Sequence, residues 1–184
     1  MSTSGGGELR RVLSSLAGVV DGDEPIDEFS HALQCASLAL RAGARPELLA
    51  AALFHDVGRA EAVRADCPKL PHETAGARWL EPRLEERVAW LVAAHVPAKV
   101  YLVSADESYF HGLSRASVAS LARQRDREPN LEQMALHPWW PDALRLRRWD
   151  DAAKVPGAPT ASIDELLAYV GKTCSRSTAR VRRS

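Results

Sequence analysis

Residues 22–59 read GDEPIDEFSHALQCASLALRAGARPELLAAALFHDVGR, and this stretch decides the predicted fold. It contains two apolar segments with helical periodicity; the first carries His31, and the second ends in the adjacent pair His55 and Asp56. Both histidines lie on the apolar faces of their segments, so both imidazoles are expected to point inward. A buried imidazole needs a polar partner. A single one is usually satisfied by a core hydrogen bond, whereas two that converge beside a carboxylate favour a metal.

Composition restricts the class of protein. The chain has 184 residues with 24 basic and 24 acidic side chains, so no global field favours nucleic acid or an anionic membrane as a partner. Its three cysteines are far apart and form no CxxC pair, which argues against a disulfide framework and predicts a cytoplasmic protein. No apolar run approaches the roughly 18 residues that a membrane span needs.

Alanine, leucine and arginine dominate and alternating β-branched residues are scarce, so we predict an all-α protein with a single domain. The domain is expected over 8–172, between a flexible N-terminus (1–7) and a basic disordered tail (173–184). Residues 59–71 contain two prolines and no clear period, which predicts a loop over the site. Helices are predicted at 8–20, 27–43, 46–56, 72–80, 82–95, 113–124, 131–136, 141–154 and 163–170, with Pro97 as an interruption.

Four of the six histidines, His31, His55, His72 and His95, share one setting, at the apolar face or buried end of a predicted helix. Together with Asp56 they form a nitrogen and oxygen donor set without thiolate, which suits iron, manganese or zinc. The set is too rich for one ion with an open position and fits two ions bridged by Asp56. By spacing alone, Asp150 reads as a solvated helix carboxylate.

His31, the pair His55 and Asp56, and the distant Asp150 resemble the H…HD…D signature of the HD-domain superfamily, an all-α fold in which most members are metal-dependent phosphohydrolases. The sequence is more similar to one branch, the mixed-valent di-iron oxygenases that cleave organophosphonates and are relatives of myo-inositol oxygenase. The resemblance covers about residues 21–170. It rests on the segments GDE…HALQ, AALFHDVG, PHE with a following GA, HVPAKVYL, LSRASVASL, RLRRWDDAAK and VPG.

The resemblance implies an Fe(II)/Fe(III) pair in a helical bundle, with O2 as co-substrate. Its ligands would be His31, His55 and Asp150 for one ion and His72 and His95 for the other, with Asp56 as the bridge. It also implies catalytic roles for Glu24, which approaches the metals before the substrate binds, and for Lys99. The phosphonate would be surrounded by Lys99, Ser117, Ser120 and Arg147. Helical spacing suggests Gln34 and Lys154 as partners that orient His31 and Asp150.

The sequence departs from the pattern of that branch at several positions. Asp21 replaces a frequent tyrosine, Arg59 replaces the second histidine of HDxGH, Pro97 enters a segment that is commonly alanine, and QRD replaces QGG at 124–126. The predicted iron ligands are intact. We take Arg59 as a candidate substrate-binding residue, and as an indication of a substrate smaller or more acidic than an aminophosphonate.

The resulting hypothesis is a di-iron dioxygenase, a monomer or small homo-oligomer, that converts a small 1-hydroxyalkylphosphonate into phosphate and a carboxylate. One alternative is an HD-domain phosphohydrolase acting on a nucleotide or phosphate ester, in which the metals activate water and no O2 is consumed. Another is a degenerate HD module that serves as a scaffold. Iron content, O2 consumption and phosphate release under argon distinguish the three hypotheses.

Overall fold

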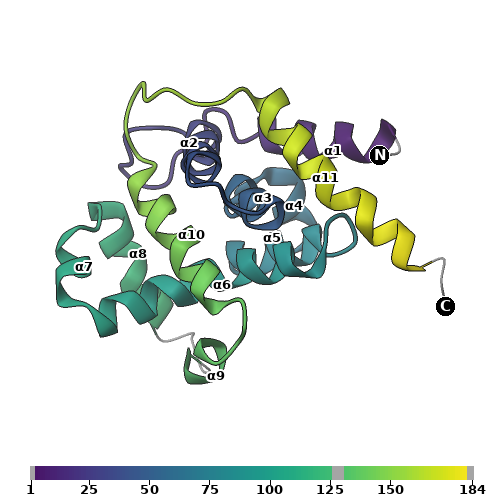
Figure 1. Ribbon diagram of the computed structural model, residues 1–184. Coiled ribbons are helices and arrows are strands. Elements are labelled where there is room, and N and C mark those ends of the chain that lie inside the picture. The colour runs from purple at the N-terminus through teal and green to yellow at the C-terminus, as the bar shows by residue number, and fades with distance from the viewer. Residues whose placement is uncertain (1–2, 126–130, 182–184) are drawn as a thin grey trace.

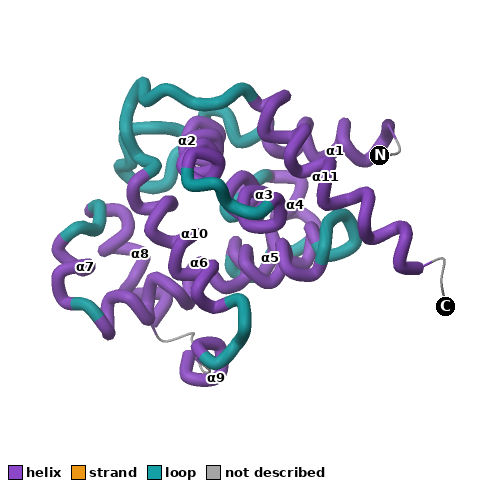
Figure 2. Tube along the Cα trace, in the orientation of Figure 1, coloured by secondary structure: helices purple, strands orange, loops and turns teal. Residues whose placement is uncertain are grey.

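The computed structural model describes residues 3–125 and 131–181, and over these residues it is helical without any strand (Figure 1, Figure 2). This confirms the predicted all-α class. The elements are α1 (Thr3–Ser14), α2 (Glu28–Arg41), α3 (Pro46–Phe54), the 3-10 turn η1 (Val57–Arg59), α4 (Glu61–Asp66), α5 (His72–Leu80), α6 (Glu86–Ala105), α7 (Glu107–His111), α8 (Arg115–Arg125), α9 (Leu131–Ala135), α10 (Trp140–Ala152) and α11 (Ile163–Val181).

Helix α3 is the centre of the bundle. Pro46 opens it at a position where its fixed φ and missing N–H are tolerated. Every residue from Leu48 to Phe54 is buried, because α2, α6, α10 and α11 all pack against this helix (Figure 1). Helix α3 therefore ends inside the protein, and the next two residues, His55 and Asp56, also lie in the interior.

Helix α2 lies against α3 and α10. The side chain of Asp27 caps its first turn by accepting a hydrogen bond from the Ser30 amide at 2.7 Å. Gly43 ends it with a φ of 63°, a conformation that glycine adopts without a steric cost. The buried face between these ends carries His31.

Helix α6 runs for 20 residues straight through Pro97, so the predicted interruption was wrong. Proline removes one backbone donor, but the helix continues because the residues on both sides of it, including Val96 and Ala98, are buried. As a result Lys99 lies one turn after His95 on the same helix. The length and hydropathy of α6 would also suit a membrane span, but 72% of its most apolar 18-residue stretch is buried inside the bundle.

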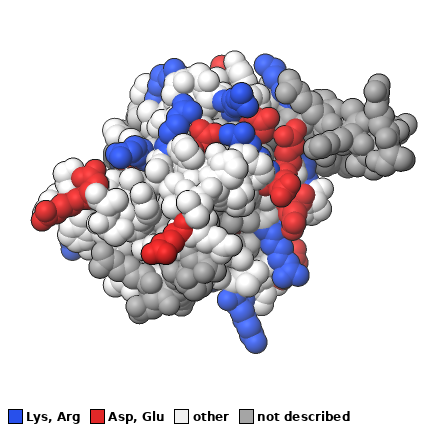
Figure 3. All heavy atoms as spheres, turned by 60° about the horizontal axis from the view of Figure 1, so that its bottom comes forward, with Lys and Arg blue, Asp and Glu red and all other residues white. Residues whose placement is uncertain are grey.

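Several other boundaries differ from those expected. Helix α1 covers residues 3–7, which were expected to be flexible, and packs against α11. The predicted loop at 59–71 contains the end of η1 and α4. Helix α7 was not predicted, and α11 continues to Val181 rather than ending at Val170. Of the expected tail, residues 182–184 lie outside the described residues. Basic and acidic side chains are interspersed on the face drawn in Figure 3, in keeping with the zero net charge.

Candidate metal centre

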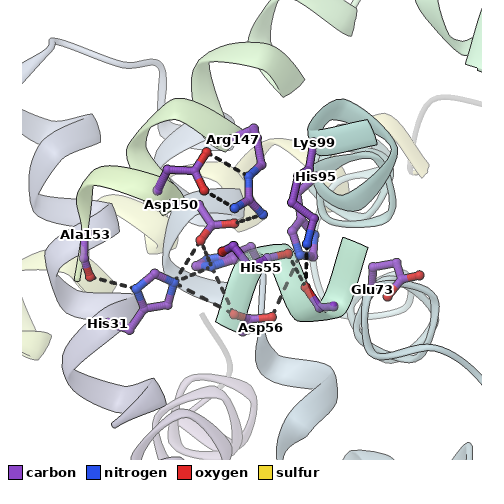
Figure 4. A network of polar contacts seen from close by, with 12 residues as sticks. His31, His55, Asp56, Glu73, His95, Lys99, Arg147, Asp150 and Ala153 are labelled. Carbon is purple, nitrogen blue, oxygen red and sulfur yellow. Dashed lines mark hydrogen bonds and ion pairs between the residues drawn. The ribbon is translucent and has the colours of Figure 1, made fainter. Parts of the chain in front are cut away.

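Six predicted ligands meet in the middle of the bundle (Figure 4). They come from five parts of the chain, namely α2, the adjacent residues 55 and 56 between α3 and η1, α5, α6 and α10. They fall into two groups in which the ligand atoms lie within 4.8 Å of one another. One group joins α2, the end of α3 and α10; the other joins the residue before η1, the start of α5 and α6. The members are His31, His55 and Asp150 in the first group, and Asp56, His72 and His95 in the second.

Asp56 lies between the two groups and directs one oxygen to each. Its Oδ2 is 3.3 Å from Nε2 of His55 and 3.9 Å from Nε2 of His31. Its Oδ1 is 3.0 Å from Nε2 of His72 and 3.8 Å from Nε2 of His95. This is the arrangement expected of a carboxylate that bridges two cations.

The imidazoles are oriented so that their Nε2 atoms face one another. The Nδ1 atoms of His31, His55 and His95 lie 2.8, 3.0 and 2.7 Å from the carbonyl oxygens of residues 153, 52 and 92, and Nδ1 of His72 is 3.2 Å from the Glu73 carboxylate. These partners only accept hydrogen bonds, so each Nδ1 is the donor, and in a neutral ring the Nε2 then carries the lone pair.

In neutral rings these lone pairs oppose each other at short range. Nε2 of His31 is 3.0 Å from Nε2 of His55, and Nε2 of His72 is 3.3 Å from Nε2 of His95. In this tautomer neither contact is a hydrogen bond, because no proton lies between the nitrogens. A cation in each group turns the repulsion into coordination, so these residues fit a pair of metal ions. Acceptors behind the imidazoles are also typical of metal sites.

Gly58 explains how η1 and α5 come close enough to share the site. A Cβ at this position would lie 1.9 Å from the carbonyl oxygen of His72 and 2.8 Å from the amide nitrogen of Gly76. Only glycine permits this approach. The HDVG motif therefore contributes twice: it supplies Asp56 as a ligand, and its glycine allows Asp56 to lie beside His72.

Two arginines keep the carboxylates ionised. Burial by itself raises the pKa of Asp56, but Arg59, whose Nε is 3.0 Å from Oδ1, brings that pKa well below its usual range. Burial likewise raises the pKa of Asp150, and Arg147, with Nη1 2.7 Å from Oδ2, more than offsets it. Both aspartates are thus available as anionic ligands.

A cavity opens onto the ligand cluster, and its empty space is about 470 Å³ with the open solvent at its mouth included. Cationic and hydroxyl side chains line the part beyond the metal ligands. Lys99 Nζ donates to Ser120 Oγ at 2.8 Å, and Lys154 Nζ donates to Ser117 Oγ at 3.0 Å. All five predicted substrate-binding residues are among those lining the cavity: Arg59, Lys99, Ser117, Ser120 and Arg147.

Comparison with known proteins agrees with this geometry. The HD domain model matches residues 29–136, more than half of the chain. The chain belongs to the HD-domain family. Hydroxymethylphosphonate dioxygenase of Gimesia maris is 38% identical over 151 residues, 78% of this chain and 75% of that protein. The [1-hydroxy-2-(trimethylamino)ethyl]phosphonate dioxygenase (glycine-betaine-forming) of Leisingera caerulea is 32% identical over 166 residues, 78% and 80% of the two chains.

Glu24 of this HD-domain protein lines the cavity but lies outside the groups of potential ligands among the described residues. Its Oε1 accepts a hydrogen bond from Ser114 Oγ at 2.6 Å and another from Lys154 Nζ. The carboxylate therefore occupies the cationic and hydroxyl part of the cavity. Lys154, which was expected to orient Asp150, instead bonds Glu24 and the serines of the α8 region.

Other polar residues of the HD-domain protein also differ from expectation. Gln34 does not orient His31; its amide exchanges two hydrogen bonds with the backbone of Val155. Arg59 contacts three carboxylates, those of Asp56, Asp21 and Glu28. Sequence reasoning missed Glu28, Glu73, Tyr109, Ser114 and Asp151. Two of them carried a local signal: Glu73 is adjacent to His72, and Asp151 follows Arg147 by four residues on α10. The partners of the other three are brought together by packing.

Proposed function

We propose that this HD-domain protein is a metal-dependent dioxygenase that cleaves the C–P bond of a small 1-hydroxyalkylphosphonate. One substrate dianion and one O2 give one carboxylate, one hydrogen phosphate dianion and one proton. The C–P bond breaks, the carbon is oxidised to a carboxylate, and O2 is reduced. The observation that carries the proposal is the bridging position of Asp56 between two imidazole groups, beside a cavity lined by lysines and serines.

The proposed cofactor is an Fe(II)/Fe(III) pair, and O2 is the proposed co-substrate. A donor set of imidazole and carboxylate without thiolate supports iron. When bound, the pair supplies the activation of O2 and the acidity that binds a substrate hydroxyl. His31, His55 and Asp150 would hold one ion, His72 and His95 the other, and Asp56 both.

The protein's own side chains bind and orient the phosphonate. A phosphonate carries nearly two negative charges, and ammonium and hydroxyl donors form charge-assisted hydrogen bonds to such a group. Lys99, Ser120, Lys154 and Ser117 provide these donors on one side of the ligand cluster. Arg147 is already paired with Asp150 and Asp151, so we assign it chiefly to holding Asp150 in place.

The cavity favours a substrate with a small substituent. Recognition of a quaternary ammonium group relies on aromatic rings, and none of the described residues lining this cavity is Phe, Tyr or Trp. The relative from Gimesia maris is named for hydroxymethylphosphonate. Of the two possibilities that Arg59 suggested, we retain a smaller substrate and abandon a more acidic one. The Arg59 guanidinium is already paired with three carboxylates, so it does not need an acidic group of the substrate as a partner.

The test is a stoichiometry. Protein purified anaerobically and loaded with Fe(II) is given hydroxymethylphosphonate and O2, and O2 uptake, phosphate and formate are measured. We expect equal amounts of all three, and much weaker turnover of a trimethylamino-substituted 1-hydroxyphosphonate. Phosphate release from a phosphate ester under argon, without any O2 uptake on the phosphonate, would establish the hydrolase instead.

The thiols of Cys35 and Cys67 are free, which supports a reducing, cytoplasmic location. We propose a monomer or small homo-oligomer acting on small molecules, without nucleic-acid or membrane partners.

A further inference from the structure

Glu28 is a buried carboxylate with an unused oxygen. It lies in the first turn of α2, less than one turn before His31, and is 5% exposed. Its Oε1 lies 3.3 Å from Nε of Arg59. Its Oε2 is fully buried and has no hydrogen-bond partner among the described residues. Such a group is costly unless something else compensates it.

The surroundings of Glu28 suggest what that compensation is. Glu28, His31 and Asp56 form a third group whose potential ligand atoms lie within 4.8 Å of one another, and Glu28 lines the cavity at the ligand cluster. The single guanidinium of Arg59 forms ion pairs with three carboxyl groups, those of Asp21, Glu28 and Asp56. Burial and the neighbouring Asp56 outweigh Arg59 and raise the pKa of Glu28 to about 9, so the Glu28 carboxyl keeps its proton until a cation beside it takes the place of that proton.

We propose that Glu28 is a further metal ligand, which adds its carboxylate to the ion held by His31, His55 and Asp150. This inference rests on the proposed two-metal centre. The two ions then differ in charge environment. The first has Asp150, Glu28 and a share of Asp56, whereas the second has two imidazoles and a share of Asp56. Because negative ligands stabilise the higher oxidation state, the first ion is the one that the chain itself biases toward Fe(III).

The test removes the charge of Glu28 and keeps its shape. In Glu28→Gln the amide oxygen can still lie beside Arg59, which keeps its hydrogen bonds to Asp56 and Asp21. We expect the affinity for one of the two ions to fall by about 10- to 100-fold, the range known for residues that support a metal site. The second ion stays bound, and the EPR signal of the mixed-valent pair changes. Affinity is measured by competition with a chelator and metal content by elemental analysis.

A matched control exists on α3. Glu47 also has a buried Oε2 without a hydrogen-bond partner, but it lies in the first turn of α3, away from the cavity lining. Glu47→Gln should leave both metal affinities and the EPR signal unchanged. Should Glu28→Gln fold poorly, Glu28→Asp gives the same measurement with the carboxylate drawn back by one methylene.

The outcomes separate this inference from the proposed function. Wild-type protein that binds fewer than two ions contradicts the two-metal centre itself. Wild-type protein that binds two ions, with Glu28→Gln also binding two at equal affinity and with the same EPR signal, overturns the role of Glu28 alone.

Discussion

The two sides of the cavity are held in different ways. On the metal side, three imidazoles are fixed by backbone carbonyls of helices and their ends, and the fourth by the carboxylate of the adjacent residue. The anion side is the part of the cavity where the phosphonate is proposed to bind. Its polar side chains mostly contact other side chains: Lys99 contacts Ser120, and Lys154 contacts Ser117 and Glu24. Backbone acceptors cannot move without the helix, whereas side-chain partners can be exchanged. The metal side is therefore preformed, and the anion side is built to change partners.

The largest effect is expected on the metal side, from Asp56→Asn. Asp56 directs one oxygen to each imidazole group, and an amide offers only one oxygen and no negative charge. Both ions should bind far more weakly, by at least the roughly 10- to 100-fold seen for supporting residues, and turnover should be abolished. Iron content by elemental analysis checks the first effect, and phosphate release the second.

The control for this change is Asp66→Asn, which alters an exposed carboxylate at the end of α4. It should leave iron content and turnover as in the wild type. Two tightly bound iron ions in Asp56→Asn would show that Asp56 is not the bridge, and that the two groups of imidazoles are filled independently.

The next effect concerns Arg147, at the border between the two sides. It is 3% exposed and pairs with Asp150 at 2.7 Å and with Asp151. Arg147→Met leaves two carboxylates without their cation, so the free energy of unfolding of the metal-free protein should fall by about 3–5 kcal/mol. Urea unfolding measures the change.

Helix α10 supplies a matched control two residues away. Arg145 pairs with Asp142 at 3.2 Å, but its side chain is 48% exposed. Exposed pairs contribute about 0–1 kcal/mol, so Arg145→Met should change the unfolding free energy little. Equal losses in the two variants would mean that the burial of Arg147 has no energetic consequence.

The same contrast explains what the sequence could predict. The all-α class and the convergence of His31 with His55 follow from apolar periodicity, because a helix face is a local property of the chain. The resemblance to the HD family supplied Asp150, which spacing alone would have left on the surface. Other features depend on pairs far apart in sequence that only packing brings together: Arg59 with Asp21, Ser114 with Glu24, and Lys154 with Glu24. The continuation of α6 through Pro97 was missed for the same reason, since burial overrides local propensity.

A smaller effect is expected from pH on the anion side. Burial, with the nearby Arg147 and Lys154, lowers the pKa of Lys99 to about 8, although Asp150 and Asp151 raise it. Lys99 is therefore cationic below about pH 8 and neutral above it. Phosphonate affinity should fall as the pH rises from 7 to 9, by up to about tenfold for each unit above the pKa. Isothermal titration with hydroxymethylphosphonate under argon measures this, and Lys99→Met should bind weakly with a flat profile over the same range.

The smallest effect tests whether the anion side exchanges partners. The Glu24 carboxylate accepts from Ser114 and Lys154 in the cavity, so a phosphonate that binds Lys154 must displace it. Glu24→Gln weakens this internal pairing, and losing one charge-assisted hydrogen bond of about 1.5–3 kcal/mol, partly replaced by the amide, should tighten the binding of inorganic phosphate several-fold. Titration of the anaerobic protein with phosphate measures the change.

The control is Asp23→Asn, which removes one negative charge from the neighbouring residue, whose side chain is half-exposed. It should leave phosphate affinity unaltered. If the two variants bind phosphate equally well, Glu24 does not compete for the cavity, and the anion side is as fixed as the metal side.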